Sequence, residues 1–150
     1  MPSSKVEAFV AKHADWIERA QERIEKRKPR LPKEQLPRIR RNSKAYKEAQ
    51  EQARTLVTAR LIHFNKVYNF TYGTISIRNQ KTRWGSCSAK GNLSFNYRIA
   101  FLPPELADYI IVHELCHTKE HNHSPRFWVE VARTIPNYLA LRNQLRTYRF

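Results

Sequence analysis

The spacing of apolar residues along the first half of the chain is helical. After a capping-box signature at Ser4 and Glu7, apolar side chains recur three or four residues apart, and Pro29 ends a predicted N-terminal helix over 1–28. A basic, proline-rich linker follows over 29–41. A second helix is expected to begin at Asn42 or Ser43, with an apolar stripe that reaches Phe64.

The period then changes from 3.6 to 2. The segments Phe70–Ile77 and Leu93–Phe101 alternate apolar and polar residues, which predicts two strands. A short strand is expected between them, over Arg83–Ser88, because Lys90-Gly91-Asn92 supplies turn residues before the second long strand.

Prolines mark the starts of three further helices, at Pro103-Pro104, Ser124-Pro125 and Pro136. The pattern therefore predicts an α+β fold in which helices pack on a small, mostly antiparallel sheet. At 150 residues we expect a single domain, with 42–150 as its core.

The predicted helix after Pro104 carries an HExxH pentapeptide, His113-Glu114-Leu115-Cys116-His117. Spacing by four places both imidazoles on one helix face, where one divalent metal can bridge them. Glu114 lies about 100° round the helix, where it can act on a water polarised by the metal rather than ligate the metal itself.

Two histidines compete for the place of a third ligand, His121 and His123. On an unbroken helix His121 would lie about 12 Å along the axis from His113, which is too far to share one ion. His123 follows a residue that tolerates a turn, Asn122, and its spacing from His117 matches that of some zincins. We favour His123, with Glu130 as a remoter candidate and Glu120 as a solvated residue at the helix end.

The charge is strongly basic, with a formal net charge of +15. No acidic residue occurs from Gln52 to Pro104, a stretch that includes Arg78, Lys81 and Arg83 as candidate contacts to DNA or RNA. Such a field attracts polyanions, but it is equally consistent with a solubility feature.

Other features of the composition indicate the compartment. There is no apolar run long enough to span a membrane, no secretory signal, and only two cysteines, which suits a reducing cytosol. We therefore expect a cytoplasmic monomer that does not associate with membranes.

Four motifs in order resemble the YgjP-like metallopeptidase family, which is related to the SprT-like and WLM zincins. They are Arg83-Trp84-Gly85-Ser86-Cys87-Ser88, Gly91-Asn92-Leu93-Ser94-Phe95-Asn96, the HExxH segment, and Asn122-His123-Ser124-Pro125-Arg126-Phe127-Trp128. The resemblance implies a zincin-like fold with HExxH on the active-site helix. It also implies one zinc per chain held by His113, His117 and His123, with Glu114 as catalytic base. Family members generally carry strands ahead of the first helix, so a smaller sheet is expected here.

The resulting hypothesis is a zinc metallopeptidase acting on proteins or peptides, with an association with nucleic acid suggested by the charge. The strand Leu93–Phe101 is a candidate edge for an extended peptide. Tyr97 and Tyr138 are candidate stabilisers of the oxyanion, whereas Trp84 and Trp128 are expected in the core. Two alternatives keep the metal: a hydrolase of nucleotides or other phosphate compounds, and a nucleic-acid-binding module with a structural zinc.

Overall fold

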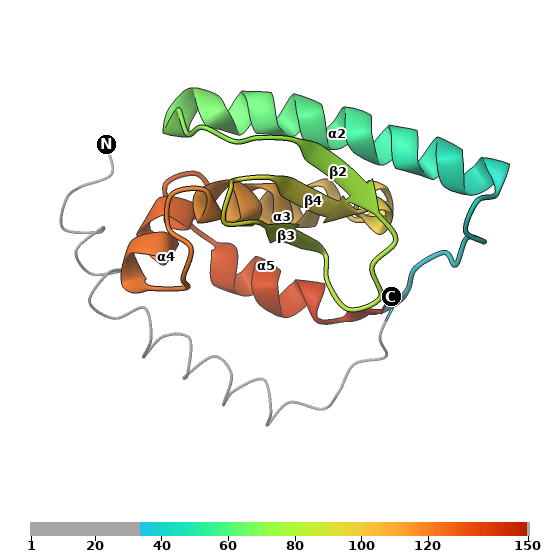
Figure 1. Ribbon diagram of the computed structural model, residues 1–150. Helices are drawn as coiled ribbons and strands as arrows, with labels where there is room; N and C mark the ends of the chain where they lie inside the picture. The colour runs from blue at the N-terminus through green and yellow to red at the C-terminus, as the bar shows by residue number, and fades with distance from the viewer. Residues whose placement is uncertain (1–33, 150) are drawn as a thin grey trace.

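The computed structural model describes residues 34–149, and the helix expected over 1–28 lies outside them, together with the first residues of the linker. The described elements in order are β1 (Glu34–Gln35), α2 (Lys44–Tyr68), β2 (Ile75–Arg78), β3 (Gly85–Cys87), β4 (Leu93–Asn96), a 3₁₀ helix η1 (Tyr97–Phe101), α3 (Pro104–His117), α4 (Pro125–Ala132), α5 (Tyr138–Leu145) and β5 (Tyr148–Arg149). In Figure 1, α2 runs across the top of the molecule, with the strands beneath it and α5 below.

The long helix α2 begins where the sequence predicts. The hydroxyl of Ser43 accepts a hydrogen bond from the amide of Tyr46, and the helix ends at Asn69 in the left-handed conformation. Its buried residues recur at helical spacing and form one stripe against the core: Tyr46, Ala49, Ala53, Val57, Leu61, Phe64 and Tyr68. This stripe packs on α3, on η1 and on β2.

The three-stranded sheet has the order β2-β4-β3. β3 and β4 form an antiparallel hairpin, whereas β2 pairs with β4 in parallel. The sheet is therefore mixed rather than mostly antiparallel, because the chain crosses from β2 to the far edge before the hairpin brings β4 back between them. A separate parallel pair, β1 with β5, joins the two ends of the described chain.

Both long predicted strands are shorter than expected. The side chain of Asn65 binds the amide and the carbonyl of Phe70, so the chain turns around the end of α2 before β2 begins at Ile75. β4 stops at Asn96, whose side chain accepts from the amide of Arg98 and starts a 3₁₀ helix instead. Because β4 is the central strand, it has no free edge, and the predicted peptide-binding edge at Leu93–Phe101 is wrong.

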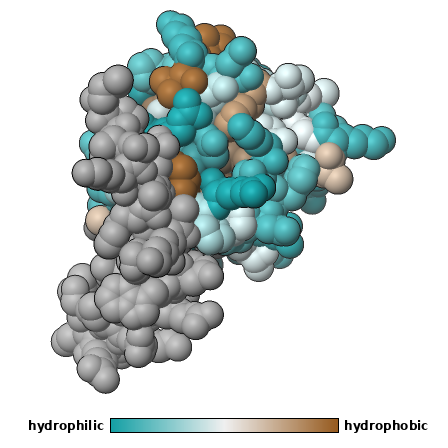
Figure 2. Space-filling view, turned by 90° about the vertical axis from the view of Figure 1, so that its left-hand side faces the viewer, coloured by the Kyte–Doolittle hydropathy of each residue, from teal (hydrophilic) through white to brown (hydrophobic). Residues whose placement is uncertain are grey.

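The HExxH helix, α3, is buried on nearly every side. It contacts α2, α4, α5 and β3, and its residues Ile111, Val112, Leu115 and Cys116 have no exposed surface. A helix that is apolar over most of its surface is buried inside a protein. The face in Figure 2 is mostly hydrophilic where it is coloured, with small separate hydrophobic spots. Among the described residues, no helix is both long enough and apolar enough to cross a membrane.

A buried polar pair, Asn96 and Arg98, holds the loop between β2 and β3. The side-chain Nδ2 atom of Asn96 donates to the backbone carbonyls of Gln80 at 2.7 Å and Arg83 at 3.1 Å. Arg98 donates to the same Gln80 carbonyl at 3.3 Å. The loop that leads into β3 is thus fixed from beneath by side chains of the neighbouring strand and η1.

Replacing Asn96 with alanine is expected to lower the free energy of unfolding by about 2 kcal/mol, because the Arg83 carbonyl loses its side-chain donor and the Gln80 carbonyl keeps only the donor of Arg98. Urea unfolding followed by circular dichroism measures it. The matched control is Asn137→Ala at the start of α5, where the side chain is exposed and makes no capping hydrogen bond. That change should shift stability by less than about 0.5 kcal/mol. Equal effects of the two substitutions would contradict the anchoring role of Asn96.

Candidate metal centre

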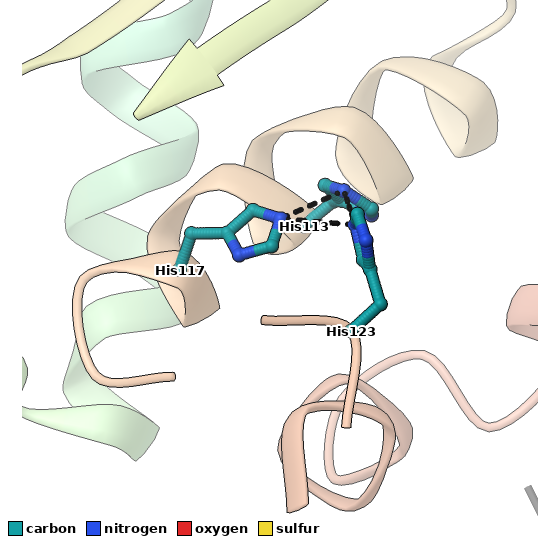
Figure 3. Close-up of side chains that lie close together, drawn as sticks. All are labelled: His113, His117 and His123. Atoms are coloured by element: carbon teal, nitrogen blue, oxygen red, sulfur yellow. Dashed lines mark hydrogen bonds between the residues drawn. The ribbon is translucent and has the colours of Figure 1, made fainter. Parts of the chain in front are cut away.

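The end of α3 determines which histidines meet. α3 ends at His117, and the amides of Lys119 and Glu120 both bond back to the carbonyl of Cys116. The chain then turns through a loop and enters α4 at Pro125. His123 lies in this loop, so it returns toward the helix face that carries His113 and His117 (Figure 3).

The three imidazoles present their Nε2 atoms to one point. The Nε2 distances are 3.2 Å between His113 and His117, 3.1 Å between His117 and His123, and 3.2 Å between His123 and His113. Three nitrogens bound to a tetrahedral zinc at about 2.0–2.1 Å would lie about 3.3–3.4 Å apart. The triangle therefore has nearly the size that three ligands of one zinc ion require.

The protonation of the rings also suits a metal. Nδ1 of His117 lies 3.0 Å from the carbonyl of Glu120, an acceptor, so Nδ1 carries the proton and Nε2 presents its lone pair. Nδ1 of His113 lies 3.5 Å from the hydroxyl of Tyr109. Three Nε2 lone pairs facing one another repel unless a cation lies between them, and the donor set therefore fits a divalent metal.

The surroundings favour the neutral form of His113 and His117. Burial lowers the pKa of His113 well below its ordinary value, and the charges of His117, His123 and Arg142 lower it further. Burial also lowers the pKa of His117. Neutral imidazole is the form that binds metals.

Aromatic rings from α4 stack on two histidines of the cluster. Phe127 stacks on His117 with ring centroids 4.3 Å apart, and Trp128 stacks on His123 at 5.8 Å. Tyr138 stacks in turn on Trp128 at 4.8 Å. Trp128 is a buried core residue, as expected, but it also supports a histidine of the cluster.

Glu114 is buried, with 5% of its surface exposed. Its Oε2 atom has no hydrogen-bond partner among the described residues. Burial raises the pKa of Glu114 to about 8, and the positive charge of Arg83 opposes this rise. A divalent cation bound nearby would favour the carboxylate form.

A glycine in β3 makes room for this carboxylate. A Cβ atom on Gly85 would lie 2.9 Å from Cγ of Glu114 and 3.2 Å from its Oε1. The same atom would lie 3.1 Å from the carbonyl oxygen of Ser94. In the sequence, Gly85 stood out only as part of a motif. No spacing rule predicts its contact with Glu114, because α3 and β3 are far apart in sequence.

The remaining candidate ligands lie outside the cluster. His121 is exposed and does not belong to the group of three, and Glu120 contributes its backbone carbonyl to His117. Glu130 pairs with Arg133 at 2.8 Å and with Lys119 at 3.9 Å.

The structure places both tyrosines that were considered as oxyanion stabilisers in the buried core. Tyr97 has no exposed surface, and its hydroxyl accepts from the amide of Ile39 at 3.5 Å, so it belongs to the core. Tyr138 is buried in the stack on Trp128. The guanidinium of Arg142 lies 5.8 Å from the centre of the Trp128 ring, and its positive charge lowers the pKa of His113. The sequence did not indicate this position.

Of the three basic residues considered as contacts to nucleic acid, two line the same hollow and the third does not. Arg78 and Arg83 line one hollow on the sheet, together with serines of all three strands. Lys81 is exposed and is not part of that lining.

Comparisons with known proteins agree with this geometry. The family model of the YgjP-like metallopeptidase domain matches residues 31–148. No curated protein matches the chain significantly. A solved structure, the metallopeptidase zymogen of Pyrococcus abyssi abylysin, is similar with a TM-score of 0.53 and 29% identity, over 60% of this chain and 90% of that one. The match across most of the chain, on a fold with three convergent histidines beside a buried glutamate, shows that this protein is a metallopeptidase belonging to the YgjP-like family.

Proposed function

We propose that the protein is a zinc-dependent peptidase in which His113, His117 and His123 hold one zinc ion and Glu114 is the general base. The observation that carries the proposal is the triangle of Nε2 atoms 3.1–3.2 Å apart. Glu114 follows His113 in α3, and its buried Oε2 atom has no hydrogen-bond partner among the described residues. The match of residues 31–148 to a metallopeptidase family supports the same proposal.

The bound metal would supply Lewis acidity, lowering the pKa of a water molecule and polarising the carbonyl of the scissile peptide bond. Glu114 takes the proton from the attacking water and passes it to the leaving nitrogen. Its buried position suits this task because a carboxyl with a pKa raised toward neutrality both accepts and releases a proton near neutral pH.

β3 is the strand that suits an extended peptide. It is an edge strand of the described sheet, and Gly85 of this strand lies against Glu114. Trp84 and Ser88 bond to β4, so the alternation of an antiparallel ladder directs the backbone groups of Gly85 and Cys87 to the open edge. We propose that a substrate pairs there, beside the catalytic carboxylate.

The two alternatives have less support. A purely structural zinc takes four protein ligands, whereas the described cluster has three and leaves a fourth position for water or substrate. Hydrolysis of phosphate compounds would use arginines near the metal, but the family match favours peptides. Association with nucleic acid remains a proposal that rests on the basic charge.

Glu114→Gln should reduce peptide hydrolysis by about 10²–10⁴-fold, because it removes a base, while one zinc per chain remains. Cleavage of an unstructured protein such as casein, measured together with zinc by atomic absorption, tests this. Glu105→Gln, on the exposed first turn of α3, is the matched control and should retain activity. Full activity or loss of zinc in the Glu114 variant would contradict the assignment.

His123→Ala should weaken zinc binding strongly, whereas His121→Ala should leave it unchanged, since only His123 reaches the other two Nε2 atoms. Competition with a chromogenic chelator measures both affinities. A zinc-replete His123→Ala protein beside a zinc-free His121→Ala protein would reverse the choice of third ligand.

Gly85→Ala should lower turnover by about 10²-fold with zinc retained, because the added methyl group displaces Glu114. Ser86→Ala, on the next residue of β3, is the control for altering the strand itself. The measurement is kcat on the same substrate, with circular dichroism to verify folding. Wild-type turnover in the Gly85 variant would show that the position of Glu114 does not depend on this contact.

A further inference from the structure

The face of the sheet turned away from the core carries a hollow of about 390 Å³. On the central strand β4, Leu93 and Phe95 are fully buried, whereas Ser94 between them is half-buried and lines the hollow. Alternation along a strand directs successive side chains to opposite faces, so this hollow lies across the sheet from the packed helices.

A row of hydroxyl groups crosses the floor of the hollow. Ser76 of β2 and Ser86 of β3 are both in register with Ser94 of β4, so the three serines stand side by side on adjacent strands. All three line the hollow, and their hydroxyls make no hydrogen bond with a described residue. A polar row that the fold does not use internally is available to a ligand.

Two guanidinium groups also line the hollow, those of Arg78 at the end of β2 and Arg83 before β3. Both residues are exposed, and neither forms an ion pair with a described acidic residue. The lining contains no acidic residue, and the sequence has none from Gln52 to Pro104. Arg83 also acts electrostatically on Glu114, but neither guanidinium is held in an ion pair with a described carboxylate. Hydroxyl donors beside two such guanidiniums form a site for an oxyanion.

We propose that this hollow binds phosphate groups of a nucleic-acid backbone. The class of ligand follows from the lining: arginine and serine donors match phosphate oxygens, and the net charge of +15 attracts a polyanion rather than a single ion. No aromatic side chain lines the hollow, so no base can stack there and binding is indifferent to base sequence. The proposal gives a location to the association with nucleic acid named above and does not depend on peptidase activity.

The test is binding of a short fluorescein-labelled DNA duplex to the zinc-loaded Glu114→Gln protein, followed by anisotropy at several salt concentrations. Arg78→Gln should weaken binding at least about ten-fold at low salt and reduce the log–log salt slope by about 1. Ser76→Ala should weaken binding without changing the slope, because it removes a donor but no charge. Lys66→Gln, an exposed charge on the last turn of α2, is the matched control and should have little effect.

Three outcomes would overturn the proposal: no binding of the duplex at low salt, equal losses in the Arg78 and Lys66 variants, or tighter binding of a phosphopeptide of equal charge. The first would make the basic charge a solubility feature, the second would spread the attraction over the whole surface, and the third would change the class of ligand. Arg78→Gln in the otherwise unaltered protein should retain peptide hydrolysis. If the hollow does not bind nucleic acid, the proposed peptidase function is therefore unaffected.

Discussion

The burial of α3 is the constraint on which the rest of the structure depends. α3 is packed by α2, by β3 and by the two C-terminal helices, so its axis and its rotation are both fixed. Fixed rotation matters because the same helix presents two imidazoles on one side and a carboxylate about 100° away. A helix held on only one face could rotate by a few degrees and move these groups away from His123 and Gly85, which other segments supply. The apolar residues between the histidines thus determine the geometry of the polar ones.

The centre is completed by chain segments that come after α3. The helix stops after its second histidine, and the loop brings His123 back. The first turn of α4 then carries Phe127 and Trp128, whose rings stack on the histidines. Histidines that bind a metal need rings held at a set angle, and stacking restrains these rings without engaging their nitrogen atoms. The third histidine of the cluster and the aromatic rings that pack on it therefore come from one short stretch of sequence.

The sequence predicted most elements because local signals mark them: Ser43 caps α2, Pro104 and Pro125 begin two helices, and HExxH shows its face by spacing alone. It predicted that His123 rather than His121 joins the other two histidines, because an unbroken helix carries His121 too far along its axis, and the structure groups His113, His117 and His123. It failed where a side chain competes with a regular ladder, as Asn96 does at the end of β4. It also could not foresee the parallel pairing of β2, or the contact of Gly85 with Glu114, since both depend on segments distant along the chain.

The hydrogen bond from His117 to the backbone carbonyl of Glu120 has a consequence for how this centre can change over time. A main-chain acceptor is present whatever side chain occupies position 120, so point mutations there do not alter which nitrogen of His117 carries the proton. The orientation of the His117 ring is instead encoded in the number of residues between the helix and the loop. Insertions and deletions over 118–122, rather than substitutions, are the changes that purifying selection would remove from this segment.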